Sequence, residues 1–179
     1  MMMRYIVKPK DIVCEIGVFQ GKFAEFLFSL TPELLVLIDP FQGIVFSGDQ
    51  DGNNGVHCNL DAVYEYLKER YRPVKSIQLI RGFSYDILPK FEDKKFNVIY
   101  IDGDHSYEGV KRDLNIALKK IKPGGYICGH DYEMNMTKAH HVYDFGVKRA
   151  VDEFCEENRL HICAKGLDGC VSFAIQVPF

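Results

Sequence analysis

The chain has 179 residues, a length that fits one domain with a substantial hydrophobic core. Hydrophobic residues make up 47% of the chain and charged residues 26%, as in an ordinary water-soluble globule. The formal net charge of −3 and a pI near 6.1 exclude a general electrostatic attraction for nucleic acid or an anionic membrane.

The N-terminal segment and the cysteines both indicate a cytoplasmic protein. Residues 1–10 are too few and too charged for a signal peptide, and no later run is long enough to span a bilayer. Cys14 and Cys128 lie inside apolar runs, and no C-x-x-C pair occurs. We therefore expect reduced cysteines that pack in the core, and no membrane association.

The first half of the chain predicts three buried strands separated by helices. Strands are expected at 11–17, 34–38 and 76–80, because these runs are short, apolar and rich in β-branched residues. Helices are expected at 22–30 and 60–71, where apolar residues recur at helical spacing. Between them, the insert 41–59 is rich in Gly, Asp and Asn and has no sustained period, which predicts a functional loop or lid.

The second half continues the same alternation. A strand at 96–101 precedes an amphipathic helix, whose apolar stripe comprises Val110, Leu114, Ala117, Leu118 and Ile121. Further predictions are a strand at 126–129, a helix at 142–157, and a hairpin of strands 160–164 and 171–177. Strands that alternate with helices predict a single α/β domain over 1–179, with a doubly wound, mostly parallel sheet and an antiparallel C-terminal hairpin.

Acidic residues and histidines follow two neighbouring strands of this sheet. Asp102, Asp104 and His105 come after one strand, and His130 and Asp131 after the next. One helix separates the two strands, so their carboxyl ends should lie at the same edge, where ligands bind in such sheets. The sequence thus predicts a functional site there.

The first strand ends in a turn suited to a nucleoside ligand. Gly17 and Gly21 stand where the strand passes into a helix, and Asp39 ends the second strand at about the 20-residue spacing from which an acid accepts ribose hydroxyls. The three-glycine dinucleotide fingerprint is missing. A nicotinamide-dependent oxidoreductase is therefore one alternative, with less support from the turn, and a non-catalytic nucleoside-binding domain is another.

Four segments carry a family resemblance: Glu15 to Gly21, Ile38-Asp39-Pro40, Tyr100 to Leu114 and Gly124 to Tyr132. The chain resembles the class I S-adenosylmethionine (SAM)-dependent methyltransferases, in particular small single domains with the motifs D-G-D-H-S-Y-E-G and G-G-x-I-x-G-H-D-Y. The resemblance implies a Rossmann-like, seven-stranded sheet and a transferase of one-carbon groups. It places SAM over the turn after the first strand.

Carried over by position, the resemblance implies roles for individual residues. Glu15, Gly17 and Gly21 would surround the methionine part of SAM, and Asp39 would hold the ribose hydroxyls. Phe83 and Ser84 would border adenine, and Asp102 would lie beneath the sulfonium. An acidic cleft suits this positively charged group.

The related catechol-type and macrolide-sugar O-methyltransferases bind magnesium at the same strand ends. The corresponding positions here are Asp102, His130 and Asp131, and His105 stands where the catechol type keeps its general base. Because His130 replaces an oxygen ligand, manganese or zinc are alternatives to magnesium. In the simpler reading, His105 and His130 only hydrogen-bond to nearby loops, and Asp104 caps the following helix.

The expected reaction is methylation of an oxygen, or with less support a nitrogen, of a small molecule. His105, Asp102 and Asp131 are the expected catalytic residues. The loop 41–59, or the second subunit of a homodimer, would cover the acceptor. The segment 132–143 would line its pocket, with His140 and His141 in a solvated loop.

Overall fold

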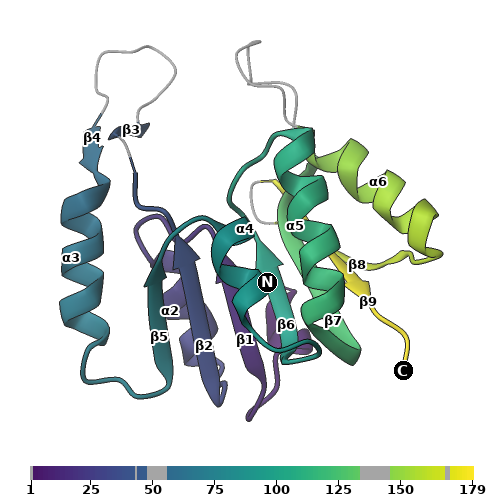
Figure 1. Cartoon of the computed structure of the whole chain (residues 1–179), viewed down its shortest axis with the longest axis horizontal. Helices are drawn as coiled ribbons and strands as arrows, with labels where there is room; N and C mark the ends of the chain where they lie inside the picture. Colours follow the sequence, from purple (N-terminus) through teal and green to yellow (C-terminus); the bar gives the residue numbers. More distant parts are fainter. Residues whose placement is uncertain (1, 43, 48–55, 134–145, 168–169) are drawn as a thin grey trace.

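A computed structural model of the chain describes residues 2–42, 44–47, 56–133, 146–167 and 170–179. Within these residues, a seven-stranded sheet has the order β5-β2-β1-β6-β7-β9-β8 (Figure 1). Its strands are β1 (Ile12–Ile16), β2 (Leu34–Asp39), β5 (Ile77–Arg81), β6 (Phe96–Ile101), β7 (Ile121–Glu133), β8 (Ile162–Leu167) and β9 (Val171–Gln176). The first five in sheet order are parallel, and β9 pairs antiparallel with both β7 and β8. This confirms the predicted doubly wound α/β fold with a closing antiparallel hairpin.

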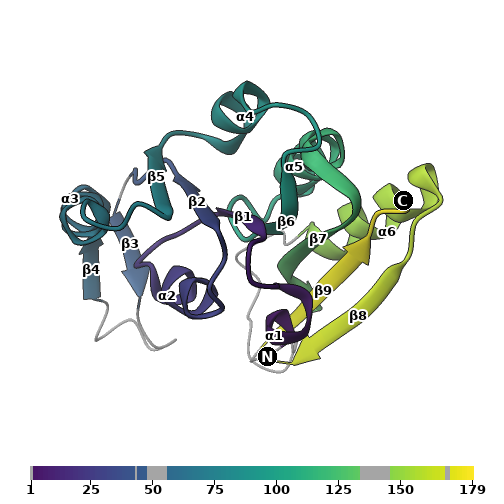
Figure 2. The same cartoon turned by 90° about the horizontal axis from the view of Figure 1, so that it is seen from below.

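Helices cover both faces of the sheet. The helices are α1 (Met3–Ile6), α2 (Lys22–Ser29), α3 (Leu60–Tyr71), α4 (Ser84–Ile87), α5 (Tyr107–Lys120) and α6 (Val147–Asn158), with a 3-10 turn η1 (Leu88–Lys90). Figure 2 shows α4, α5 and α6 on one face and α1 and α2 on the other. Successive strand residues alternate between the faces, so Leu35 and Leu37 pack with α2, whereas Val36 and Ile38 pack in the core that contains α5. Burial on both faces explains the continuous apolar runs of the central strands.

The main departures from the predicted elements are one longer strand, three short helical segments and two strands inside the insert. β7 is longer than expected and includes Pro123 to Gly125, and α1, α4 and η1 were not predicted. Inside the insert 41–59, β3 (Ile44–Ser47) pairs antiparallel with β4 (Val56–Asn59). The remainder of the expected lid, 48–55, and the segment 134–145 with its histidine pair lie outside the described residues.

The sheet register brings the ends of four strands level with one another. Ile16 at the end of β1 pairs with Ile38 of β2 on one side and Ile101 of β6 on the other, and Ile101 pairs with Gly129 of β7. The residues that follow these positions therefore share one edge of the sheet, as predicted for parallel strands. In the described part of the chain, no helix is long and apolar enough to cross a membrane.

Candidate functional site

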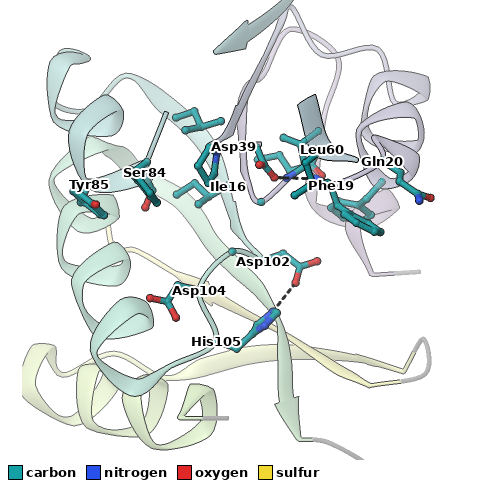
Figure 3. Close-up of a pocket in the computed structure, with 18 of the residues that line it drawn as sticks. Ile16, Phe19, Gln20, Asp39, Leu60, Ser84, Tyr85, Asp102, Asp104 and His105 are labelled. Carbon is teal, nitrogen blue, oxygen red and sulfur yellow. Dashed lines mark hydrogen bonds and ion pairs between the residues drawn. The ribbon is translucent and has the colours of Figure 1, made fainter. Parts of the chain in front are cut away.

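A cavity of about 860 Å³ opens along this edge of the sheet. Its volume lies within the ~300–1,000 Å³ that small-molecule sites usually have. Figure 3 shows Phe19 and Gln20 on one side of it, Ser84 and Tyr85 on the other, and Asp102 and His105 between them. The cavity takes its lining from the ends of β1, β2, β5 and β6, so a single ligand can contact residues far apart in the sequence.

The turn after β1 forms the floor of the cavity, and at Gly17 it leaves no room for a side chain. Gly17 has a φ of +86°, and a Cβ built on it would lie 1.9 Å from the carbonyl oxygen of Asp102. The Gly17 amide donates to the carbonyl of Ile38 at 2.9 Å, and the Asp102 amide donates to that of Ile16 at 2.8 Å. Only glycine fits this close approach of two strand ends. Gly21, the N-cap of α2, also has a positive φ, of 77°.

Asp39 ties this turn to the end of β2. Its Oδ2 accepts hydrogen bonds from the amides of Val18 (2.8 Å) and Phe19 (2.9 Å), and its Oδ1 accepts one from Phe41 (2.6 Å). A carboxylate has about four acceptor positions, so one remains on Oδ1. Asp39 lines the cavity, as the prediction for a ribose-binding acid requires, but most of its capacity serves the backbone.

Glu15 is a buried acid at the bottom of the cavity. It is 1% exposed, and within the described residues its Oε2 has no hydrogen-bond partner. Burial, and then the charges of Asp102 and Asp39, raise the pKa of Glu15 well above its usual value. A cationic ligand in the cavity would offset both the burial and the repulsion.

Aromatic rings and a buried carboxylate build the wall that α4 and α5 contribute. The rings of Phe83 and Tyr85 stack with their centroids 5.1 Å apart, and the Arg112 guanidinium lies 4.1 Å above Tyr85. The hydroxyl of Ser84 donates to Oδ1 of Asp113 at 2.7 Å. This fixes the hydrogen of the hydroxyl and leaves its lone pairs as acceptors for a ligand.

Three members of this wall were missed by the sequence analysis: Tyr85, Arg112 and Asp113. Asp113 could have been found, because it stands between Val110 and Leu114 on the apolar stripe of α5. A carboxylate in such a stripe must have a polar partner or change its pKa. Burial raises the pKa of Asp113 to about 6, against the hydrogen bond from Ser84 and the charge of Arg112.

His105 lies between two carboxylates at the end of β6. Its Nε2 is 3.2 Å from Oδ1 of Asp102 and 3.1 Å from Oδ2 of Asp131. The hydrogen bond with Asp102 raises the pKa of His105, burial opposes this, and the charge of Asp131 adds to the increase. Strands β6 and β7 thus deliver His105, Asp102 and Asp131 to one point, as predicted.

The loop from Asp102 to Ser106 also starts helix α5. The hydroxyl of Ser106 caps the helix by accepting the amide of Gly109 at 3.1 Å, and Asp104 accepts the amide of Ser106 at 3.0 Å. The alternative role foreseen for Asp104, as the cap, thus belongs to Ser106, with Asp104 supporting it. This arrangement fixes the position of His105 next to the cavity.

His130 and Asp131 are consecutive, yet their side chains meet. Asp131 has a φ of +57°, and the pairing of β7 with β9 shifts register between Gly129 and Glu133. Nδ1 of His130 lies 3.2 Å from Oδ1 of Asp131. Burial by itself would raise the pKa of Asp131, but the hydrogen bond with His130 and the charge of that histidine lower it.

The possible metal ligands of the described residues fall into two groups that share Asp131. One is Asp102, His105 and Asp131, and the other is His130, Asp131 and Cys170. The set predicted from the sequence, Asp102, His130 and Asp131, is divided between them. Cys170, which precedes β9, was missed because only the antiparallel pairing of β9 brings it to this edge.

A family model described as a methyltransferase domain matches residues 14–132. These residues contain the turn after β1, Asp39, the aromatic wall and the cluster around His105. The chain belongs to this methyltransferase family.

Solved structures of methyltransferases share the fold of this one. A SAM-dependent methyltransferase from Methanosarcina mazei superposes with a TM-score of 0.67 at 11% identity, over 99% of this chain and 97% of that one. One from Aquifex aeolicus gives 0.65 at 14% identity, over 98% and 87%. The N-methyltransferase NodS of Bradyrhizobium japonicum gives 0.61 at 14% identity, over 96% and 88%. At these identities the likeness concerns the fold alone.

A curated relative, an uncharacterised protein of Acanthamoeba polyphaga mimivirus, is 29% identical over 126 residues. The match covers 66% of this chain and 50% of the relative, so the methyltransferase spans about half the length of that protein.

Family and fold support SAM as the cofactor, and the residues of the cavity suit it. The unpartnered Oε2 of buried Glu15 and the carboxylates of Asp39 and Asp102 make the cavity attractive to a cation such as a sulfonium. The stacked rings of Phe83 and Tyr85 offer an apolar contact to a base.

Proposed function

We propose that this methyltransferase domain methylates a hydroxyl oxygen of a small molecule, with His105 as the general base. The observation that carries the proposal is the position of His105, at the wall of the cavity and in contact with both Asp102 and Asp131. A hydroxyl loses its proton during methylation, whereas an amine can react once it is neutral. A positioned imidazole therefore favours an oxygen acceptor over a nitrogen one.

SAM supplies an electrophilic methyl group on a sulfonium, and the chain supplies its placement. Gly17 would admit the methionine part, and Gly21, where a side chain would meet Leu67 and Tyr71 and not the cavity, would shape the turn around it. Glu15 would face the cationic groups of SAM, and Asp39 would use its remaining acceptor position for a ribose hydroxyl. Phe83 and Ser84 would border adenine, and Asp102 would lie under the sulfonium. In-line placement of the acceptor oxygen then provides most of the acceleration.

His105 would remove the acceptor proton. A neutral imidazole that donates its Nε2–H to one of the two carboxylates keeps the lone pair of Nδ1 as the proton acceptor. The same carboxylates stabilise the imidazolium that forms. Asp102 and Asp131 thus orient His105 and balance its charge.

Metal assistance is part of the proposal. Asp102, His130 and Asp131 would hold a divalent ion such as Mg²⁺, Mn²⁺ or Zn²⁺, which would lower the pKa of an acceptor hydroxyl. Asp131 is the member that both ligand groups share, because its Oδ2 contacts His105 while its Oδ1 contacts His130. On that arrangement His105 stays available as the base.

The test is methyl transfer from labelled SAM to a panel of phenols, catechols, hydroxylated sugars and amines. We expect His105→Ala to lower kcat by about 10²-fold or more, the usual contribution of a general base, with SAM affinity by calorimetry unchanged. His161→Ala is the matched control, because His161 is exposed and just precedes β8. SAM binding without turnover on any acceptor would instead indicate a non-catalytic binding domain. Turnover of amines alone would show that the acceptor atom is nitrogen and not oxygen.

A further inference from the structure

Strand β7 is irregular at the two residues that follow Gly129. In a regular strand, consecutive side chains point to opposite faces, so His130 and Asp131 would diverge. Here the register against β9 shifts, and Asp131 adopts a left-handed φ of +57°. Such bulges re-aim side chains and are common beside active sites. The result is that both side chains converge on one point.

Cys170 reaches the same point from the other side of the register shift. Val171 at the start of β9 pairs with Glu133 of β7, which places Cys170 beside the bulge. The possible ligand atoms of His130, Asp131 and Cys170 all lie within 4.8 Å of one another. The thiol also hydrogen-bonds to Asp131.

We propose that His130, Asp131 and Cys170 form a binding site for one divalent cation of the zinc class. The donors are an imidazole nitrogen, a carboxylate oxygen and a thiolate sulfur, a combination that zinc and cobalt prefer and magnesium does not. Nδ1 of His130 and Oδ1 of Asp131 are 3.2 Å apart. Ligands of a tetrahedral zinc at about 2.0–2.1 Å are separated by about 3.3 Å, so this pair needs little rearrangement.

Binding at this site would release one proton, because the thiol of Cys170 must become a thiolate to coordinate the ion. Three protein ligands leave a fourth position for water or another small ligand. The ion would join the bulge of β7 to the start of β9. It would also fix Asp131, whose other oxygen contacts His105.

The inference deepens the metal assistance proposed above by naming the ion class and by placing Cys170, in the position given there to Asp102, beside His130 and Asp131 as the third ligand. It rests on the proposed function only for its consequence in catalysis, since binding of the ion requires neither SAM nor an acceptor. Metal binding and SAM binding can therefore fail separately.

The experiment is a titration of the metal-stripped, reduced full chain with Co²⁺, followed by competition with Zn²⁺. We expect one equivalent of Co²⁺ to produce an intense thiolate-to-cobalt absorption band that Zn²⁺ removes and Mg²⁺ does not. Cys170→Ser should abolish the band and weaken Zn²⁺ binding by more than about tenfold, because even an outer-shell partner usually contributes that much. Zn²⁺ should also protect Cys170 from alkylation, as measured by mass spectrometry.

Two control variants locate the ion. Cys163→Ser removes an exposed thiol of β8, and the band should persist. Asp102→Asn removes the carboxylate of the other group, and the band should again persist. A wild-type protein without a thiolate band, or a Cys170→Ser variant that retains the band, would overturn the inference. Co²⁺ binding that depends on Asp102 but not on Cys170 would also overturn it, in favour of the oxygen-rich group. A protein that binds zinc but not SAM would refute the proposed function alone.

Discussion

The two halves of the carboxyl edge are held together by different kinds of contact. In the half proposed to bind the cofactor (the cofactor half), at the ends of β1 and β2, Asp39 receives hydrogen bonds from the backbone, and Gly17 lies against the backbone of Asp102. In the half proposed to bind the acceptor (the acceptor half), at the ends of β6 and β7, His105 and His130 contact the carboxylates of Asp102 and Asp131. Backbone contacts fix a shape, whereas contacts between titratable side chains can exchange protons. This difference supports the proposal that the first half binds the cofactor and the second carries out the reaction.

Gly17→Ala should break the cofactor half and have the largest effect. The new Cβ would meet the carbonyl of Asp102 at 1.9 Å in a backbone conformation that favours glycine. We expect the unfolding free energy to fall by about 3 kcal/mol or more, and SAM binding to be lost. Urea unfolding and calorimetry measure these two effects.

Gly103→Ala is the matched control, because the nearest atom to a Cβ there is 3.4 Å away. It should leave the unfolding free energy close to that of the wild type. Equal behaviour of the two variants would contradict a floor made of touching backbones.

Asp39→Asn should weaken the same half to a smaller extent. Three amides donate to Asp39, and an asparagine offers one oxygen, so its NH₂ group would face at least one donor. A buried unsatisfied donor costs about 2 kcal/mol, measurable by urea unfolding. Asp61→Asn, at an acid whose side chain is 70% exposed and paired with Arg81, should cost less than about 1 kcal/mol. Equal costs would show that the backbone hydrogen bonds of Asp39 contribute little.

Asp113→Asn should remove a pH dependence from the unfolding free energy of the chain. Burial raises the pKa of Asp113 to about 6 from a usual value of 3.8. The folded chain thus binds this proton more tightly than the unfolded chain, so the contribution stabilises the fold at low pH and is lost as pH rises through about 6. Between pH 5 and pH 7.5 the unfolding free energy of the wild type should fall by about 1–1.5 kcal/mol through this group, and that of the variant should not.

The measurement is urea unfolding of wild type and variant at both pH values, with Asp86→Asn as a control for removing an exposed charge near Ser84. The asparagine oxygen can still accept the hydrogen bond from Ser84, so SAM affinity at pH 7.5 should change little. A stability difference between wild type and Asp113→Asn that is the same at both pH values would contradict the raised pKa.

Much of the fold and part of the site follow from the sequence. Buried strands can be recognised in the sequence as runs of β-branched residues. The parallel topology then brings Asp39, Asp102 and Asp131 to one edge of the sheet. Local backbone geometry is harder to foresee. The sequence analysis expected His130 and Asp131 at one site, but not the left-handed conformation of Asp131 that lets their consecutive side chains meet. Asp tolerates this conformation better than most residues do, yet residue type alone does not show where the chain adopts it.

Contacts that depend on register were also missed. Cys170 joins His130 only through the pairing of β9 with β7, and Arg112 joins the cavity only because α5 packs beside α4. The insert 41–59 was expected to be irregular, yet its two arms pair as β3 and β4. Such short hairpins have weak periodicity in the sequence.

The central claim is that one cavity holds SAM in its cofactor half and presents the acceptor to His105 in the other. The most direct test is a crystal structure of the full chain with S-adenosylhomocysteine. We predict the ribose at Oδ1 of Asp39, the amino group near Glu15, and the sulfur between Asp102 and His105. A nucleoside bound elsewhere, or a sulfur that points away from His105, would contradict the account.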